Sequence, residues 1–164
     1  MGTKGSKIVG VDIQALIARL NKGLADEWLA YYQYWIGARV AQGRMRGIVA
    51  EELAEHASDE LKHAGQLAER IIQLGGTPLL KPEDWYKETS CGYDAPQDPN
   101  TKVLVRQNIK GEQCAIDFYK GLADFVKDKD PITYHLAIEI LTDEVEHEDD
   151  LEAILADMET PVGG

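Results

Sequence analysis

The feature that most constrains this chain is a set of four long stretches with helical periodicity, each interrupted near its middle by carboxylates. Apolar residues recur three or four positions apart over residues 12–41, 45–74, 101–127 and 131–158, a spacing that places them on one face of an α-helix. Nothing in the sequence indicates a β-strand. We therefore expect an all-α protein, folded as a single domain over residues 1–164 because this length supports one hydrophobic core.

Glycine and proline residues predict how these helices are connected. Gly43 separates the first two stretches, and Gly75-Gly76 followed by Pro78 ends the second. Residues 75–99 contain four prolines, so this segment cannot be one helix and should form an ordered crossover. Asp130-Pro131 marks a short turn before the last helix. Two antiparallel hairpins joined by one long crossover should make a four-helix bundle.

The two ends of the chain give simpler expectations. Asp12 is expected to cap the first helix with its carboxylate, and Pro161–Gly164 should form a non-helical tail. Residues 1–10 contain no apolar run of signal-peptide length, and no stretch of about 20 apolar residues could span a membrane. We expect a soluble cytoplasmic protein without a membrane partner.

Six polar residues occupy positions where the helical periodicity requires buried side chains. They are Glu27, Glu60, His63, Glu112, Glu144 and His147. Residues at positions i and i+3 are neighbours on a helix, so each Glu-x-x-His motif can offer an oxygen and a nitrogen to one ion. Four carboxylates at one level of a bundle would repel one another unless cations neutralised them.

We therefore expect two metal ions per subunit, bound by all six residues. Glu60 and Glu144 should bridge the ions, and Glu27 and Glu112 should bind at the two ends. Oxygen and nitrogen ligands without thiolate favour iron or manganese, and the imidazoles also accept zinc.

The spacing of these residues indicates an internal duplication. Glu60 follows Glu27 by 33 residues and Glu144 follows Glu112 by 32, while Tyr34 and Tyr119 each follow the earlier glutamate by seven. The two tyrosines are expected to pack in the core and to hydrogen-bond the ligand carboxylates. His56, one turn before Glu60, is either an additional metal ligand or a core histidine that hydrogen-bonds a carboxylate.

Together, the helix spans, the crossover and the six polar residues resemble the ferritin superfamily across nearly the whole chain. The ligand spacing is similar to that of bacterioferritin, which implies a di-iron site within one subunit. Leu61 stands where a haem-binding bacterioferritin would have methionine, so no haem is expected. The chain stops after the fourth predicted helix, and it resembles Dps-like proteins called thioferritins, which implies a hollow shell of twelve identical subunits.

The sequence has only two cysteines, Cys91 in the crossover and Cys114 two residues after Glu112. The residues alone leave two interpretations open. Cys114 could be a small core residue and Cys91 an incidental loop thiol, or both could lie beside the metal site as a redox pair. The resemblance to thioferritins implies the redox pair, with a possible disulfide.

The function that this resemblance implies is that of an iron-sequestering ferroxidase. Such a protein would oxidise Fe(II) at the di-iron site with hydrogen peroxide or dioxygen and would store Fe(III), which protects against oxidative stress. A non-storage di-metal peroxidase or a manganese catalase could use the same six ligands. The sequence has no C-x-x-C pair, which argues against an iron–sulfur electron supply of the rubrerythrin type.

An alternative of another class is a DNA-compacting shell protein. The formal net charge is −12, and the amino-terminal segment has only Lys4 and Lys7 as basic residues. Because a negative field repels phosphate backbones, we expect no DNA binding.

Overall fold

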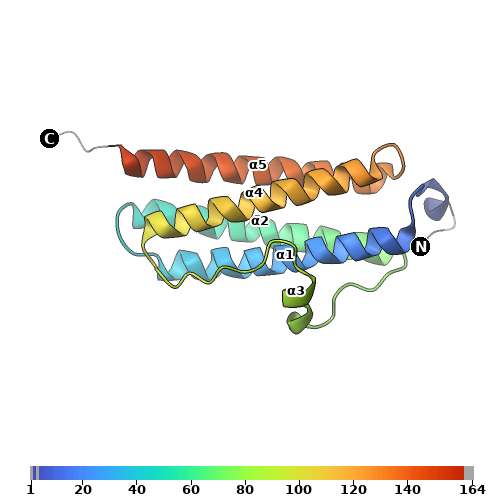
Figure 1. The fold of residues 1–164 in the computed structure, drawn as a ribbon, viewed down its shortest axis with the longest axis horizontal. Coiled ribbons are helices and arrows are strands. Elements are labelled where there is room, and N and C mark those ends of the chain that lie inside the picture. Colours follow the sequence, from blue (N-terminus) through green and yellow to red (C-terminus); the bar gives the residue numbers. More distant parts are fainter. Residues whose placement is uncertain (1, 3, 161–164) are drawn as a thin grey trace.

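The computed structural model describes residue 2 and residues 4–160, so the predicted tail 161–164 lies outside the described residues. Four long helices form the bundle in Figure 1: α1 (Ile13–Val40), α2 (Arg46–Gln73), α4 (Thr101–Val126) and α5 (Pro131–Glu159). A short helix α3 (Pro82–Glu88) lies in the crossover, and a 3-10 turn covers Gly5–Ile8. The four long helices begin and end within one residue of the stretches that showed helical periodicity.

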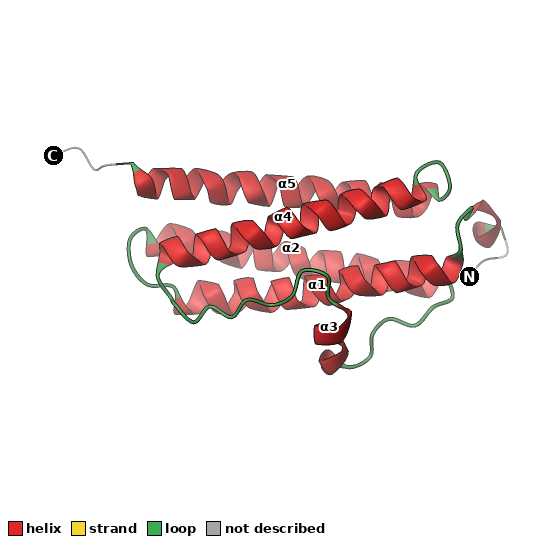
Figure 2. Ribbon diagram, in the orientation of Figure 1, coloured by secondary structure: helices red, strands yellow, loops and turns green. Residues whose placement is uncertain are grey.

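The helices pair as two antiparallel hairpins, α1 with α2 and α4 with α5 (Figure 1). The segment between α2 and α4 runs back along the bundle, so that α4 begins near the turn between α1 and α2. Figure 2 shows helices joined by loops, with no strand in the described part of the chain. The predicted all-α bundle with a long crossover is therefore confirmed.

Local sequence explains where the helices begin and turn. The Asp12 carboxylate accepts a hydrogen bond from the backbone N–H of Ala15 at 2.7 Å, which makes it the predicted cap of α1. Asp130 caps α5 in the same way, with Pro131 in the first turn where its missing N–H costs nothing. Gly43 has a φ of 110°, a conformation that other residues rarely adopt, and it allows the tight turn before α2.

The crossover is held against α1 and contains a helix that the sequence analysis did not anticipate. Pro82 begins α3, and two acidic residues in its first turn complement the helix dipole. The Trp85 ring stacks on Trp28 of α1, with ring centroids 5.1 Å apart. At the far end, Gln42 donates its backbone N–H to Pro99 at 2.7 Å. The crossover is thus ordered along its length.

Two apolar clusters lie on either side of a polar layer in the middle of the bundle. One cluster includes Leu20, Leu67 and Ile140, and the other includes Leu53 and Leu151. The buried glutamates and histidines lie between them, so apolar packing holds the four helices at a fixed distance around the polar layer. Among the described helices, none has the length and apolar content needed to cross a membrane.

Candidate metal centre

The structure brings the six sequence-predicted residues together at the middle of the bundle. Glu27 comes from α1, Glu60 and His63 from α2, Glu112 from α4, and Glu144 and His147 from α5. All six are buried, and the most exposed of them, His147, is only 5% exposed. Each helix turns its polar residues inward because its apolar neighbours on the same face pack in the two core clusters.

The six side chains form two overlapping groups of possible ligands. One group contains Glu27, Glu60, His63 and Glu144, and the other contains Glu60, Glu112, Glu144 and His147. In each group, one atom per residue lies within 4.8 Å of the others. Glu60 and Glu144 belong to both groups. This is the arrangement that two metal ions with two bridging carboxylates require.

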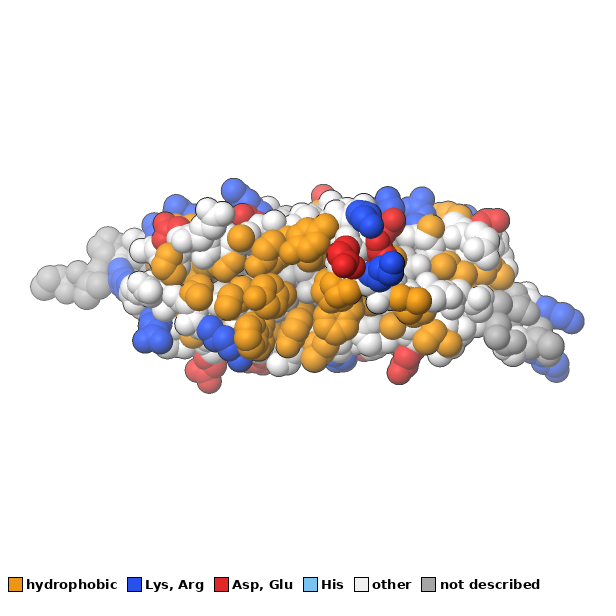
Figure 3. All heavy atoms as spheres, turned by 90° about the horizontal axis from the view of Figure 1, so that it is seen from below, with side chains coloured by type: hydrophobic (Ala, Val, Ile, Leu, Met, Phe, Trp, Pro, Cys, Tyr) orange, Lys and Arg blue, Asp and Glu red, His pale blue; other side chains and the backbone are white. Residues whose placement is uncertain are grey.

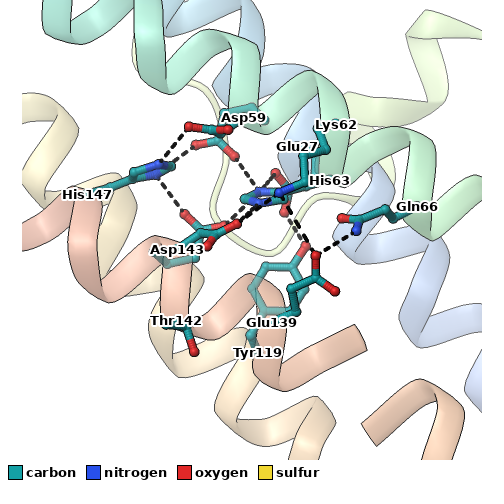
Figure 4. A network of polar contacts seen from close by, with 12 residues as sticks. Glu27, Asp59, Lys62, His63, Gln66, Tyr119, Glu139, Thr142, Asp143 and His147 are labelled. Carbon is teal, nitrogen blue, oxygen red and sulfur yellow. Dashed lines mark hydrogen bonds and ion pairs between the residues drawn. The ribbon is translucent and has the colours of Figure 1, made fainter. Parts of the chain in front are cut away.

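The two histidines direct one ring nitrogen each into the cluster. His63 Nδ1 lies 3.3 Å from Glu60 Oε2 and from Glu144 Oε1, and 3.6 Å from Glu27 Oε2. His147 Nδ1 lies 3.4 Å from Glu144 Oε2. In Figure 4 both imidazoles lie among the carboxylates that the dashed lines connect. Each ring could therefore bind an ion through Nδ1.

The opposite ring nitrogens face two aspartates that the sequence analysis missed. His63 Nε2 lies 2.9 Å from Asp143 Oδ2, and His147 Nε2 lies 3.6 Å from Asp59 Oδ2 (Figure 4). A carboxylate at this position fixes the ring orientation and makes the imidazole a better metal ligand. The sequence did contain a signal for these aspartates, because an aspartate precedes the glutamate in both motifs, which read Asp-Glu-x-x-His. Each aspartate contacts the histidine of the other hairpin, so spacing along one helix did not reveal it.

The two tyrosines connect the hairpins crosswise. Tyr34 of α1 donates its hydroxyl to Glu112 of α4, and Tyr119 of α4 donates to Glu27 of α1. Burial, followed by repulsion from Glu27 and Glu144, raises the pKa of Tyr119, so this hydroxyl keeps its proton and remains a donor. Both tyrosines can therefore orient the terminal carboxylates.

Electrostatics show how the cluster avoids an unfavourable charge in the absence of cations. Burial, followed by repulsion from Glu144 and Glu27, raises the pKa of Glu60 well above its ordinary value. Burial and repulsion from Glu144 likewise raise the pKa of Glu112. Burial also acts to raise the pKa of Glu144, but the neighbouring His147 and His63 lower it to about 2. The raised pKa values of Glu60 and Glu112 favour the protonated carboxyls in the absence of cations.

Several buried atoms have no well-aligned hydrogen-bond partner among the described residues: both oxygens of Glu144 and Nδ1 of His147. Such atoms normally cost free energy unless another group satisfies them. Oxygen and imidazole ligands fit iron, manganese and zinc. The donor atoms and their unsatisfied state thus fit a pair of divalent ions.

The two cysteines lie beside this cluster and form a disulfide in the structure. Their Cα atoms are 5.7 Å apart although they are 23 residues apart in the sequence. Asp26, the neighbour of Glu27, holds the loop in place by accepting the backbone N–H groups of Ser90 at 2.8 Å and Cys91 at 2.9 Å. Asp26 could not be predicted as a site residue from the sequence, because nothing in the crossover indicates which helix residue it contacts.

A cavity of about 210 Å³ leads from the cluster past this disulfide. Glu27, Glu112 and two further ligand glutamates line its inner part, and Cys91 lies in its wall. Its lining also includes Asp94 and Lys110, which are exposed. The cavity thus extends from exposed residues to the carboxylates on the α1 and α4 side.

His56 lies on the opposite side, between α2 and α5. It is 2% exposed, and its ring stacks on His147 with centroids 4.0 Å apart. Its Nε2 is 3.2 Å from Glu52 Oε1. Burial, followed by the charge of His147, lowers the pKa of His56 to about 3. His56 also forms a further group of possible ligands with Glu52 and Asp150.

Comparisons with known proteins agree with this fold. A family model described as a ferritin-like domain matches residues 17–160. The DNA protection during starvation protein of Pyrococcus furiosus is 33% identical over 149 residues, which are 89% of this chain and 80% of that protein. A bacterioferritin of Brucella melitensis is 32% identical over 142 residues, which are 85% of this chain and 82% of that bacterioferritin.

A solved structure gives a close match over the whole fold. It is a dodecameric thioferritin, the bacterioferritin-related protein of Bacteroides fragilis, with a TM-score of 0.94 and 43% sequence identity. The match covers 96% of this chain and 95% of that one. The resemblance to Dps-like proteins of the thioferritin type is therefore confirmed.

Proposed function

Because this chain belongs to the ferritin-like family, we propose that it is a ferroxidase that oxidises Fe(II) at the six-residue cluster and stores Fe(III). Its similarity to Dps and bacterioferritin proteins supports an iron-sequestering function. The observation that carries the proposal is the sharing of Glu60 and Glu144 between the two ligand groups. Two shared carboxylates allow two neighbouring ions to bind, and each ion can then give one electron to a two-electron oxidant.

In this proposal each residue has a defined role. Glu60 and Glu144 bridge the two substrate ions. Glu27 with His63 holds one ion, and Glu112 with His147 holds the other. The outer residues Asp59, Asp143, Tyr34 and Tyr119 position these ligands through the contacts described above.

The oxidant we propose is hydrogen peroxide or dioxygen, which would reach the carboxylates through the cavity beneath the crossover. Each Fe(II) gives up one electron, so two ions and two protons convert one peroxide molecule into two water molecules. The raised pKa values of Glu60 and Glu112 favour their protonated forms in the absence of cations. Removing Fe(II) and peroxide together would suppress the formation of hydroxyl radicals, which links iron storage to protection from oxidative stress.

A store needs a closed shell, and we propose a hollow assembly of twelve identical subunits. The similar protein of Bacteroides fragilis is dodecameric. Figure 3 shows hydrophobic side chains gathered on the face where the crossover covers α1. Exposed aromatic and aliphatic residues of these segments include Tyr32, Leu80 and Tyr86. Contiguous apolar surface of this kind is typical of an interface between proteins.

We propose no role in DNA compaction, although the Pyrococcus relative is named for DNA protection. The net charge of −12 opposes phosphate binding, and Lys4 and Lys7 are the basic residues of the amino-terminal segment. We expect no shift of DNA in a gel at neutral pH and low salt. A salt-sensitive shift would contradict this part of the proposal. The absence of haem remains a prediction from Leu61.

The test of the function is anaerobic loading with Fe(II), followed by peroxide or air, with particle mass and iron per subunit measured together. We expect a twelve-subunit particle that takes up many more than about two irons per subunit. The variant Glu144→Gln should lose rapid oxidation, whereas Glu152→Gln, an exposed position on the same helix, should retain it. Uptake that stops near two irons with fast peroxide turnover would instead indicate a non-storage peroxidase or catalase.

A further inference from the structure

Two side-chain amides are buried in the cavity that leads from the metal cluster past the disulfide. Gln33 of α1 is 9% exposed and Asn108 of α4 is 2% exposed, and both line this cavity together with ligand glutamates. Asn108 lies one turn before Glu112 on the same helix. A buried amide requires hydrogen bonds that an apolar side chain in the same space would not require. The two amides therefore point to a use other than packing.

The internal duplication contains an apolar version of the same contact. When the first helices of the two hairpins are aligned on their ligand glutamates, Gln33 corresponds to Phe118. In the same alignment Asn108 corresponds to Gly23. The Phe118 ring packs directly on Gly23, where an added Cβ atom would come within 2.9 Å of the ring. The bundle thus tolerates an apolar contact between α1 and α4 at the equivalent position, and amides occur only on the side of the cavity.

Backbone groups at both ends determine how the two amides are oriented. The Asp94 N–H donates to Gln33 Oε1 at 2.9 Å, and Asn108 Nδ2 donates to the Leu104 carbonyl at 2.9 Å. Gln33 Nε2 must then face Asn108 Oδ1, to which it donates at 2.9 Å. A carboxamide has two N–H donors, and within the described part of the chain these bonds use one on each residue. Each amide keeps a second N–H for a molecule in the cavity.

We propose that Gln33 and Asn108 select hydrogen peroxide over dioxygen as the oxidant that enters through this cavity. The ligand glutamates in the inner wall supply acceptor oxygens, and the amides add N–H donors beside them. Hydrogen peroxide can donate an O–H to a carboxylate and accept an amide N–H at the same time. Dioxygen has no hydrogen to donate and is a weak acceptor, so the amides do not favour its binding. This selection rests on the proposed ferroxidase function and names the oxidant of that reaction.

A structural role of the amides in holding the crossover has to be separated from selection. Gln33 accepts the Asp94 N–H, and Gln107, which lines the same cavity, donates its side-chain amide to the Asp94 carbonyl. The variant Gln107→Leu is therefore the matched control. It removes a contact to the same crossover residue and leaves the N–H groups of Gln33 and Asn108 in place.

The kinetic test measures kcat/KM for hydrogen peroxide and for dioxygen in stopped-flow oxidation of Fe(II). The double variant Gln33→Leu, Asn108→Leu removes both amides together, so neither is left facing a lost partner. The ratio of the two kcat/KM values, peroxide over dioxygen, should fall by about tenfold in this variant. The control Gln107→Leu should keep the ratio. A ratio within about twofold of the original in the double variant, or an equal fall in the control, would overturn the selection and leave the ferroxidase proposal intact.

A second readout does not depend on turnover. Crystals of the zinc-loaded protein, in which the bound ions are not oxidised, are soaked in hydrogen peroxide. We expect one elongated peak, too short for two separate waters, within hydrogen-bond distance of Gln33 Nε2 and Asn108 Nδ2. The control should keep this peak and the double variant should lose it. Absence of the peak in the unmodified protein would overturn the peroxide site. The peak without Fe(II) oxidation in any of the proteins would instead overturn the ferroxidase proposal and leave a cavity that binds peroxide.

Discussion

Removal of the Cys91–Cys114 bridge is expected to lower the free energy of unfolding by about 3 kcal/mol. The bridge joins residues 23 positions apart, so it closes a loop that includes the end of the crossover and the first half of α4. In the chain-entropy model, a loop of this length restricts the unfolded chain by that amount. The double variant Cys91→Ala, Cys114→Ala removes the restriction.

The folded state should change little in this variant. The Asp26 carboxylate still accepts the backbone N–H groups of Ser90 and residue 91, because these bonds involve no cysteine side chain. The six possible metal ligands lie on helices and are packed between the two core clusters. Zinc binding by the paired-metal centre should therefore be retained, and the lost stability should come from the unfolded state.

The assay is equilibrium unfolding in urea, with chelator, at one subunit concentration, because the stability of an oligomer depends on concentration. The single variant Cys114→Ala is the control, and it should lose as much stability as the double variant because either change removes the bridge. Treatment of the unmodified protein with a reductant should produce a similar loss. A difference below about 1 kcal/mol would refute the loop argument, and lost zinc binding would show that the bridge positions the centre.

Three further predictions concern the ligand contacts, the protons and the helix cap. The variant Asp143→Asn should weaken zinc binding by roughly 10- to 100-fold because His63 loses its carboxylate partner; unchanged affinity in a competition titration would contradict this. The pKa values of Glu60 and Glu112 are raised in the folded apoprotein, so above about pH 4.5 these two groups bind more protons in the folded than in the unfolded state. The contribution of these two groups to the free energy of unfolding therefore falls as the pH rises above about 4.5. Zinc binding should then release protons, which calorimetry in buffers of different ionisation enthalpy measures, and a heat independent of buffer would speak against it. The variant Asp12→Ala should lower the free energy of unfolding by about 1 kcal/mol in urea titrations, since α1 loses its cap.

The sequence was sufficient for the fold because its strongest signals are local. Helical periodicity and turn residues depend on neighbours within a few positions, and they predicted the all-α bundle that the structure confirms. The grouping of Glu60 with His63 and of Glu144 with His147 also follows from one turn of helix. The prediction that these groups meet required only that all four inward faces share one core.

Contacts between hairpins and within the crossover could not be predicted in this way. The pairing of His63 with Asp143 depends on how far α5 is shifted along the bundle axis relative to α2, and no residue spacing determines this shift. The Asp26 carboxylate binds backbone N–H groups of the crossover, and any residue there could have supplied them. The cavity beside Cys91 is lined by residues of this loop together with residues of the helices, so it depends on where the loop packs. Each of these features depends on non-local packing.

The internal duplication covers the possible metal ligands, and the two sides of the bundle next to them depart from it. The ligands and the Asp59/Asp143 pair repeat in both hairpins, so the centre itself is nearly symmetric. The departures from the repeat lie next to it, where Asp26 corresponds to Gly111 and His56 to Ile140. Asp26 anchors the crossover and its disulfide on the α1 and α4 side, and the His56 ring stacks on His147 on the α2 and α5 side. The two sides of the centre therefore differ in structure because of residues that lie outside the repeat.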